Sequence, residues 1–407
     1  MSKLDELIQQ YCPDGVEILT ISDIALKFTD GMHNLPKTSI EKSGYPILSA
    51  QNINNGLIDM NASKYVDEDT FNRENKRTNV KKGDLLLTIV GAIGRVAVVE
   101  NNLKALFQRS VCVIKPNNDI VTSKYLRYAL ESTTVQAFIQ LNAHGAAQKG
   151  IYLKDVGKIK IPVPPLEVQG EIVRILDNFT ELTAELTAEL TVELTARKKQ
   201  YEFYRDKLLN FGNVRGEATS DVAWRALSEI ADISTGSSNT DDAVEGGCYP
   251  FFVRSQQPLA KDEYEYDEEA IITAGDGVGV GKVFHYINGK YALHQRAYRI
   301  HPATDGLLGK YLYYYFVATF PKYIGQQMYQ GSVPSIRRPM LNKFQVAIPS
   351  LDVQKRIVNV LDNFDAICSD LKIGLPAEIE ARQKQYEFYR DKLLTFKEST
   401  NGQKETL

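Results

Sequence analysis

The sequence contains few cysteines and histidines, and their spacing argues against a metal site. Its 407 residues include only four cysteines and five histidines, namely Cys12, Cys112, Cys248, Cys368, His33, His144, His285, His294 and His301. No Cys-x-x-Cys pair and no Cys/His cluster is present, so a zinc site is not expected. The sequence therefore predicts no bound metal and a reducing, cytoplasmic environment.

Long apolar runs and an excess of basic residues are also absent. No stretch of 18 apolar residues occurs, and the first ten residues, MSKLDELIQQ, lack the apolar core of a signal peptide. We therefore expect a globular protein that does not associate with membranes. The net charge is −3, so there is no overall basic field, and any nucleic-acid surface must be a local patch.

Recognisable catalytic motifs are missing as well. The stretch GDGVGVGKV, residues 275–283, resembles a phosphate-binding loop but has Asp276 and Val283 where that motif needs Gly and Ser or Thr. Its glycines fit a tight turn between strands better. The chain has no Gly-x-Ser-x-Gly motif, and it lacks the Asn/Asp-Pro-Pro-Tyr/Phe motif with which amino-methyltransferases hold a flipped base. We expect no catalytic residue.

What the sequence does contain is an internal repeat. Residues 197–211, RKKQYEFYRDKLLNF, match residues 382–396, RQKQYEFYRDKLLTF, at thirteen of fifteen positions. Residues 166–179 match residues 351–364 at nine of fourteen positions, with the same offset of 185. Because a flexible linker would tolerate drift in length, the constant offset indicates that the distance between the two blocks is fixed.

The segments between these blocks repeat more weakly. Three pairs correspond: YPILSAQN (45–52) with YPFFVRSQ (249–256), GAIGRV (91–96) with GVGVGKV (277–283), and QRSVCVIKP (108–116) with QRAYRIHP (295–302). The last pair makes Gln108 and Arg109 equivalent to Gln295 and Arg296. The pattern predicts two diverged domains, each followed by a conserved helix.

The conserved blocks have the periodicity of long helices. Across residues 166–211 apolar side chains recur every three or four positions, and later every seven, as at Tyr201 and Leu208. Seven-residue spacing is typical of a coiled coil. Such a helix would be about 65–70 Å long. Gly374 and Pro376 interrupt the second copy, with Pro376 placed as a first-turn proline.

Three Thr-x-Glu-Leu units occupy residues 183–194 of the first helix. A period of four makes the leucine row drift by about 40° per unit around the helix. The repeat also stacks glutamates at i,i+4, which helix propensity does not explain. Two interpretations remain open: a solvated coiled-coil face, or a spacer whose length is the functional quantity and to which each unit adds about 6 Å.

The block KQYEFYRDKLL is rich in aromatic and basic residues, which are enriched at protein interfaces. A helix needs only its seam residues to pack, yet both faces of this block are nearly identical in the two copies. Seam packing alone remains an alternative, and we favour a seam combined with a partner surface. The predicted partner-binding residues are Tyr201, Tyr204, Arg205, Leu208, Tyr386, Tyr389, Arg390 and Leu393.

The two variable regions, residues 16–160 and 222–347, have the pattern of mixed strands and turns with a helix late in each. Their polar loops are rich in side chains that read base edges, since Arg and Lys pair with guanine and Asn and Gln with adenine. Solvated loops are the alternative. The predicted DNA-binding residues are Gln51, Asn52, Lys76, Arg77, Arg95, Gln108, Arg109, Gln148 and Lys149 in the first region, and Arg254, Gln256, Lys282, Gln295, Arg296, Ser335, Arg337 and Arg338 in the second.

This layout closely resembles the S (specificity) subunit of type I restriction-modification systems, and the type IC group with Thr-Ala-Glu-Leu repeats looks nearest. The resemblance covers essentially the whole chain, although the last unit here is Thr-Val-Glu-Leu. It implies a non-catalytic subunit that binds two methyltransferase subunits, and restriction subunits through the assembled complex. Each variable domain would read one half of an asymmetric double-stranded DNA target, and the tetrapeptide count would set the unread gap. S-adenosylmethionine, ATP and Mg would be cofactors of the partner subunits only.

The expected fold is α+β, with two similar mixed α/β target-recognition domains separated by two long antiparallel coiled-coil helices in a pseudo-twofold internal repeat. The expected segments are residues 1–162 and 213–348 for the domains, and 163–212 and 349–407 for the helical spacers. Two rival classes remain: a coiled-coil scaffold or adaptor without base-specific DNA reading, and a standalone DNA-modifying enzyme. The duplicated polar loops speak against the first, and the missing motifs against the second.

Overall fold

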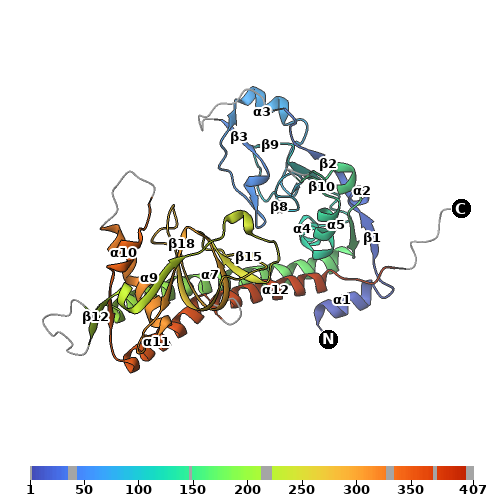
Figure 1. Ribbon diagram of the computed structural model, residues 1–407. Coiled ribbons are helices and arrows are strands. Elements are labelled where there is room, and N and C mark those ends of the chain that lie inside the picture. Colours follow the sequence, from blue (N-terminus) through green and yellow to red (C-terminus); the bar gives the residue numbers. More distant parts are fainter. Residues whose placement is uncertain are drawn as a thin grey trace. The chain divides into compact units, whose positions relative to one another are not determined.

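The computed structural model describes residues 2–34, 44–145, 149–211, 222–326, 334–369 and 374–399. The chain divides into two compact units, one formed by Met1–Ala188 with Glu380–Leu407 and the other by Glu189–Ile379 (Figure 1). Each unit contains one domain with strands and parts of the long helices. The repeat in the sequence is therefore also a repeat in the fold.

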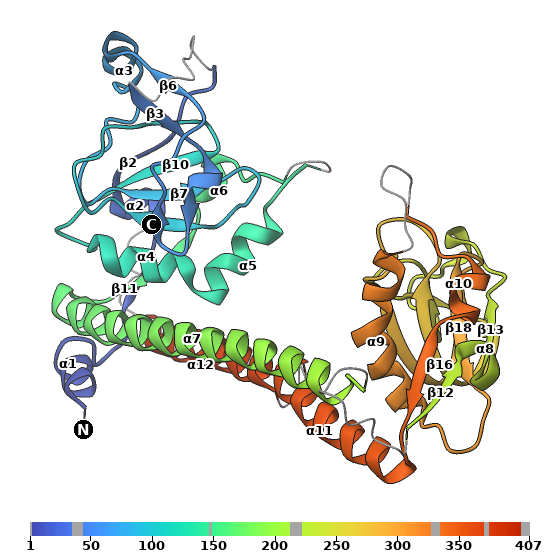
Figure 2. The same cartoon turned by 90° about the vertical axis from the view of Figure 1, so that its left-hand side faces the viewer.

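In the first unit, four antiparallel strands in the order β2-β10-β7-β8 form the main sheet, and β6-β3-β9, β1-β11 and β4-β5 form smaller ones. Figure 2 shows α4 and α5 between the strands of this domain and α7. The elements are α1 Lys3–Tyr11, β1 Glu17–Thr20, α2 Ile21–Ile24, β2 Ala25–Asp30, β3 Tyr45–Leu48, η1 Ala50–Asn52, β4 Ile53–Asn54, β5 Leu57–Ile58, β6 Tyr65–Val66, α3 Glu68–Glu74, β7 Leu85–Thr88, β8 Val96–Val98, β9 Leu106–Phe107, β10 Val111–Pro116, α4 Ser123–Glu131, α5 Thr133–Leu141, α6 Leu153–Val156, β11 Lys160–Val163 and the start of α7 Leu166–Leu208.

In the second unit, six strands in the order β13-β18-β16-β17-β14-β15 form one sheet, and β12 pairs with β19. The elements are β12 Ala223–Ala226, α8 Leu227–Ile230, β13 Ala231–Thr235, η2 Thr240–Asp242, β14 Tyr249–Phe252, β15 Leu259–Lys261, β16 Tyr266–Ala274, β17 Phe284–Leu293, β18 Ala297–Pro302, α9 Gly309–Gly325, α10 Arg338–Asn342, β19 Gln345–Ile348, α11 Leu351–Ser369 and α12 Leu375–Leu393, whose last part belongs to the first unit.

The two domains share an unusual strand pairing. Only β3 with β9 in the first domain, and β14 with β17 in the second, run parallel among the paired strands of the described residues. In both domains the strand before the long helix pairs with the strand that opens the domain, β11 with β1 and β19 with β12. Apolar runs such as Leu85–Thr88 are completely buried in these sheets, as expected for central strands.

A buried glutamine fixes the start of each long helix to its own domain. The side chain of Gln169 donates to the carbonyls of Ile120 and Pro164 and accepts from the amide of Thr122, at 2.8–2.9 Å. Gln354 makes the same three contacts in the second unit, with Gly306, Pro349 and Leu308. Both glutamines are fully buried. This satisfied polar contact accounts for the glutamine kept at the equivalent position of both copies.

The long helices contact each other through equivalent rings. In the first unit Phe179 of α7 lies 6.0 Å from Tyr389 of α12, and in the second Tyr204 of α7 stacks at 5.9 Å on Phe364 of α11. In each pair, one ring belongs to the block of residues 166–179 or 351–364, and the other belongs to the block of residues 197–211 or 382–396 of the other copy. The prediction that the long helices pack against each other is confirmed, and so is the first-turn position of Pro376 in α12.

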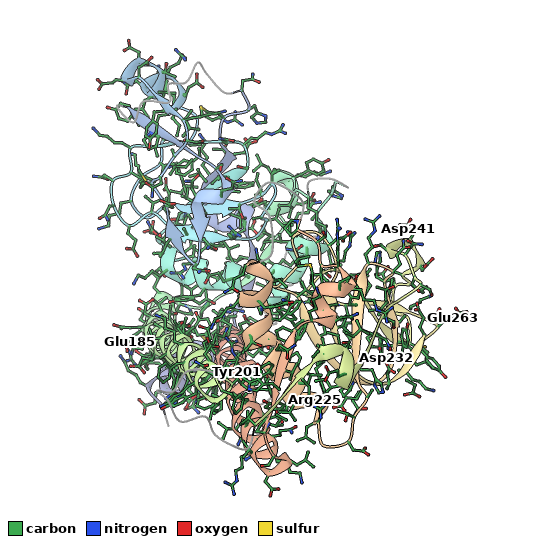
Figure 3. The ribbon with its side chains drawn as sticks, turned by 60° about the vertical axis from the view of Figure 1, so that its left-hand side comes forward. Glu185, Tyr201, Arg225, Asp232, Asp241 and Glu263 are labelled. Carbon is green, nitrogen blue, oxygen red and sulfur yellow. The ribbon has the colours of Figure 1, made fainter. Side chains whose placement is uncertain are left out.

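The Thr-x-Glu-Leu units lie within an unbroken helix of 43 residues. Their leucines change environment along it, from half-buried Leu186 to Leu190 at 9% exposed and then half-buried Leu194, as the drift of a four-residue period predicts. The glutamates stay at the surface, and Figure 3 labels Glu185 among the side chains of α7.

Candidate functional site

Four segments of the first domain meet where its central strands end. The amide of Gln108 donates to the carbonyl of Leu48, that of Ile89 to Ser110, and that of Ile151 to Ile89, each at 2.9 Å. These bonds join the polar loops that follow β3 and β7, the segment before β10, and the loop that returns near residue 150. The loops predicted from the sequence therefore converge.

The second domain builds the same framework from equivalent backbone bonds. The amide of His294 donates to Phe252 at 2.9 Å, that of Gly275 to Arg296 at 2.8 Å, and that of Ile336 to Gly275 at 2.7 Å. The parallel ladders agree, because Leu48 pairs with Phe107 and Phe252 with Leu293. The convergence of four segments is thus duplicated in the chain.

This framework corrects one equivalence drawn from the sequence. Matching the letters Gln-Arg aligned Gln108 with Gln295, but the residue after the parallel pair is Gln108 in one domain and His294 in the other. Their amides donate to the equivalent carbonyls of Leu48 and Phe252. Arg109 is therefore equivalent to Gln295, one residue out of the expected register, because strand pairing rather than residue identity sets the alignment.

Three facing positions of the framework carry different side chains in the two domains. In the second domain they are Arg254, Asp276 and Arg296. The Nη1 atoms of Arg254 and Arg296 contact separate oxygens of the Asp276 carboxylate, at 2.7 and 3.2 Å. The equivalent positions of the first domain hold Ala50, Val90 and Ser110. Ala50 comes two residues after Leu48, Val90 comes one residue after Ile89, and the carbonyl of Ser110 accepts from the Ile89 amide.

The glycine-rich turn brings these charged groups together. A Cβ on Gly275 would lie 2.6 Å from the carbonyl oxygen of Arg296, and one on Gly279 would lie 2.5 Å from that of Arg254. Gly277 has a φ of +80°, a conformation that side chains disfavour. The turn is one wall of a hollow of about 390 Å³ that Arg254 and Asp276 also line. Its glycines thus serve close backbone approach in a turn.

Charges around Asp276 keep it ionised. Burial alone would raise the pKa of its carboxyl, but the hydrogen bond from Arg254 and the charges of Arg254 and Arg296 hold the pKa below the ordinary value. Nearby His294 is buried, and its Nδ1 accepts from the amide of Arg296 at 2.9 Å. Burial and the two arginines lower the pKa of His294, so it stays neutral at pH 7.

In the first domain, three predicted DNA-binding side chains bond to their own domain. Asn52 caps η1 and donates to the carbonyls of Asp59 and Asn61 at 3.0 and 2.9 Å. Arg77 holds the carbonyl and carboxylate of Asp30, and Arg95 donates to the carbonyl of Ile53 at 3.2 Å. The other described members are exposed or half-exposed: Gln51, Lys76, Gln108, Arg109 and Lys149. Gln148 lies outside the described residues.

In the second domain, two predicted glutamines are anchored. Gln256 donates to the carbonyl of Lys282 at 2.6 Å, and Gln295 donates to the side chain of Asn239. Four further members are exposed, near the returning loop or the glycine-rich turn: Lys282, Ser335, Arg337 and Arg338. Ser335 forms a β-bridge with Asp276, which places its backbone beside that of Asp276.

The predicted partner residues of the helices divide between two faces. Leu208 and Leu393 are partly buried against the cores of their own units, as is Tyr201, labelled in Figure 3. Arg390 is only 8% exposed and pairs with Asp391 at 2.9 Å. Arg205 and Tyr386 are also partly buried. These side chains hold the helix to its unit.

The outward aromatic face of each copy consists of a phenylalanine and the exposed part of a tyrosine whose ring also contacts the other long helix. Phe203 is 62% exposed and its equivalent Phe388 63%, while Tyr204 and Tyr389 are 39% and 41% exposed. Phe203 and Phe388 are not among the partner-binding residues predicted from the sequence, which combined seam positions with other aromatic and basic residues of the block. Their identical position in both copies was the signal that could have found them.

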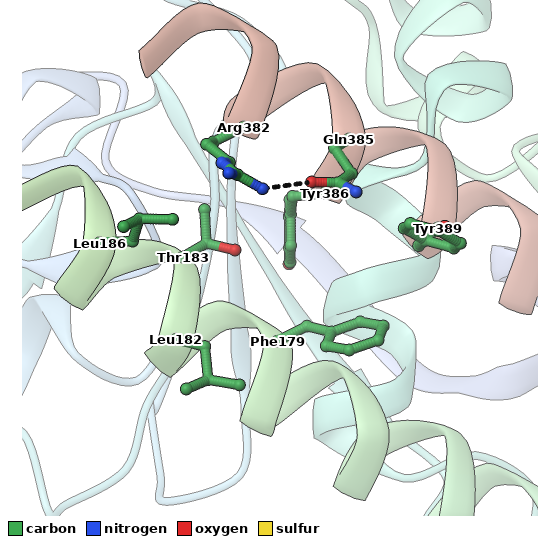
Figure 4. A pocket seen from close by; sticks show the side chains of 8 residues that line it. All are labelled: Phe179, Leu182, Thr183, Leu186, Arg382, Gln385, Tyr386 and Tyr389. Carbon is green, nitrogen blue, oxygen red and sulfur yellow. Dashed lines mark hydrogen bonds between the residues drawn. The ribbon is translucent and has the colours of Figure 1, made fainter. Parts of the chain in front are cut away.

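In the first unit, Tyr389 also borders a small hollow between α7 and α12 (Figure 4). It has a volume of about 200 Å³ and is lined by Phe179, Leu182, Thr183, Leu186, Arg382, Gln385, Tyr386 and Tyr389. The phenol of Tyr386 lies 3.0 Å from the Thr180 hydroxyl and so links α12 to α7.

Within the described ranges no cluster of three or more His, Cys, Asp or Glu side chains could hold a metal ion. None of the helices in the described part of the chain is long and apolar enough to cross a membrane.

The sequence matches the family of the type I restriction modification DNA specificity domain twice, over residues 13–196 and 219–381. The chain belongs to this family. It is a DNA specificity subunit with two target-recognition domains, and in this family catalysis lies in the partner subunits of the type I complex.

Two relatives illustrate the match. The specificity subunit of the type I restriction enzyme EcoR124I/EcoR124II from Escherichia coli is 34% identical over 274 residues, which cover 60% of this chain and 65% of that subunit. A putative type I restriction enzyme specificity subunit from Haemophilus influenzae is 36% identical over 253 residues, covering 59% and 64%. The chain thus spans slightly less than two thirds of their length.

A solved structure supports the fold. This chain aligns with a chain from a structural study of complex assembly and conformational transition in the type I R-M system. The TM-score is 0.60 at 17% identity, and the alignment covers 94% of this chain and 98% of that one. The α+β fold of two domains with packed long helices is therefore shared.

Proposed function

We propose that each domain reads one half of an asymmetric, bipartite double-stranded DNA target, and that the chain delivers this specificity to a methyltransferase and restriction complex. The observation that carries the proposal is the duplicated framework of four converging segments. Its backbone bonds are the same in both domains, whereas the facing side chains differ, as Ala50 and Arg254 do. A constant scaffold with variable side chains suits the reading of two different half-sites.

The proposal includes two methyltransferase subunits, one for each copy of the outward aromatic face. Phe203 with Tyr204, and Phe388 with Tyr389, expose aromatic surface of the kind enriched at interface hot spots. Equal exposure in two copies suits two identical partners. Restriction subunits would join through the assembled complex.

The proposal also assigns α7 the role of a spacer of the type IC kind. Its three Thr-x-Glu-Leu units would set the number of base pairs left unread between the half-sites. A helix without a break is a suitable spacer because its length scales with residue number.

The remaining parts of the proposal concern charge and cofactors. A net charge of −3 is compatible with DNA binding if the partners supply much of the phosphate contact. S-adenosylmethionine, ATP and Mg would be bound by the partner subunits, in the cytoplasm where the DNA lies. The alternative function is a coiled-coil adaptor that does not read bases.

One experiment separates these functions. The chain is co-expressed with its methyltransferase subunit, purified through a tag on the chain, and assayed for methyl transfer to random-sequence duplex DNA. Co-purification with sequence-specific methylation supports the proposal. Co-purification with equal methylation of all sequences would favour the coiled-coil adaptor that does not read bases. Methylation by the chain without its partner would show that the chain is an enzyme.

A further inference from the structure

The three facing positions of the duplicated framework differ in charge between the two domains. In the second domain they hold Arg254, Asp276 and Arg296, joined by two ion pairs. In the first domain they hold two uncharged small or apolar side chains and a hydroxyl, and the Ser110 hydroxyl accepts from the amide of Ala50 at 3.1 Å. Since the backbone bonds around them are equivalent, the difference lies in the side chains and not in the scaffold.

The ion pairs leave most of both guanidinium groups available. Arg254 and Arg296 each use Nη1 on Asp276, and no other side-chain hydrogen bond of either arginine is found within the described ranges. Their side chains are 39% and 60% exposed, whereas that of Asp276 is 27% exposed. The carboxylate therefore holds one nitrogen of each guanidinium, and both arginine side chains remain more exposed than the carboxylate.

Stability alone does not account for this arrangement. Ion pairs between groups this exposed contribute little to folding, because solvent screens them. The same positions in the first domain dispense with all three charges and keep the framework. The triad is thus dispensable for building this part of the fold.

The carboxylate also favours one ligand chemistry over another. A site for a phosphate would gain from two unopposed arginines, and Asp276 cancels one of their charges. A base edge with two neutral acceptors is suited instead to a guanidinium that is held in place. Guanine O6 and N7 are the pair with which arginine makes its commonest specific contact in the major groove.

We propose that the second domain reads guanine through Arg254 and Arg296, and that Asp276 is the positioning residue that fixes both. The first domain, with Ala50, Val90 and Ser110 at these positions, reads its half-site by other contacts. The inference rests on the proposed DNA-reading function and adds the base and the residues that select it.

The test uses the complex of the full chain with its methyltransferase subunits, and duplexes that vary one base pair of the methylated motif at a time. The second half-site should contain a guanine whose replacement lowers methylation by about 10- to 100-fold. Replacing that guanine by 7-deazaguanine, which removes only N7, should have an effect in the same direction. Arg254→Ala or Arg296→Ala should abolish the preference at that base pair and leave the first half-site unchanged.

Asp276→Asn tests the positioning role, because it keeps the shape and removes the charge. Discrimination at the guanine should fall by about 10-fold, with first half-site discrimination unchanged as evidence that the subunit folds and assembles. Asp276→Glu, which restores the carboxylate, should recover part of the loss. Glu263→Gln removes one exposed negative charge from the same domain and should leave discrimination at both half-sites as in the wild type.

The failures are distinguishable. A wild-type complex without any methylation motif would remove the proposed function itself. A bipartite motif whose second half lacks guanine on both strands, or an Asp276→Asn variant that slows methylation of every sequence equally, would overturn only the assignment of the arginine pair.

Discussion

The phenol of Tyr128 donates a hydrogen bond of 2.8 Å to the carboxylate of Asp177, and so joins α4 of the first domain to the long helix α7. Lys124, one turn earlier on α4, pairs with the same carboxylate at 2.7 Å. In the second unit Tyr314 and Lys310 make the same contacts with Asp362, at 2.5 and 2.9 Å. Each domain is therefore attached to its own helix by one repeated arrangement.

Tyr128→Phe should loosen this attachment without disturbing the rest of the domain. The Asp177 carboxylate loses one hydrogen bond but keeps its ion pair with Lys124, so the stability of the α4–α7 contact should fall by about 1 kcal/mol. Hydrogen exchange of the α4 amides should become about fivefold faster. Tyr11→Phe, at an exposed tyrosine of α1, is the control, and equal exchange in both variants would show that the bond contributes nothing.

Phe203→Ala and Phe388→Ala should weaken binding of the methyltransferase subunits, one copy each. Truncation of an aromatic residue at the centre of an interface typically weakens the binding free energy by about 2 kcal/mol, which lowers the affinity about 30-fold. Titration calorimetry should give one weakened site for each single variant and two for the double variant. Leu26→Ala removes a side chain that is 73% exposed elsewhere, and binding should not change. Wild-type affinity at both sites of the double variant would refute this surface.

Glu171 should make stability depend on pH. Its hydrogen bonds to Arg174, at 2.6 Å, outweigh its burial and, with Lys3 at 3.1 Å, lower the pKa of its carboxyl from 4.5 to about 2. Because the folded pKa is the lower one, the stabilisation is complete above about pH 4.5 and is lost as the pH falls towards 2.

Urea unfolding should therefore show that the free energy of unfolding of Glu171→Gln is lower than that of the wild type. This difference should be constant above pH 5 and should shrink below pH 4. Glu167→Gln, at an exposed acid in the first turn of α7, should show no such trend. A deficit that stayed constant down to pH 3 would rule out the carboxylate contacts as its cause.

Deletion of residues 187–190 removes one complete Thr-x-Glu-Leu unit from α7. The helix should shorten by about 6 Å with about 40° of rotation, and the leucine and glutamate rows stay in register. We expect the unread gap to shorten by one base pair, with part of the length absorbed by bending or tilt, and both half-sites to stay unchanged. The methylated motif of the deletion variant measures this, and an unaltered gap would mean that the repeat is only a coiled-coil face.

The long helices and their attachment followed from the sequence more directly than the reading site. The blocks around Gln169 and Gln354 repeat because each glutamine satisfies three backbone groups of its domain, so the helix starts were predictable. The register of the site was not, since strand pairing, which local sequence does not contain, shifts Arg109 by one residue against Arg296. The ion pairs of Asp276 could not be predicted either, because strand pairing is what brings Arg254 and Arg296 to this carboxylate.

The partner surface shows another limit of periodicity. Arg390 was predicted as a partner contact because arginine is enriched at interfaces, but it is nearly buried beside Asp391, whose carboxylate accepts from the Thr133 amide of the domain. Phe388, two residues earlier, faces outward. A seven-residue pattern identifies the buried seam of a helix and cannot say which of the other faces a partner will use.

The most direct test is the motif methylated in the genome of a host whose only DNA methyltransferase is the complex of this chain with its methyltransferase subunits. The account predicts one asymmetric motif with two short specified parts, separated by a fixed number of unspecified base pairs. Substitution of Arg254 and Arg296 should change only one of the two parts. A single uninterrupted motif, or a change in both parts after that substitution, would contradict the reading of two half-sites by two domains.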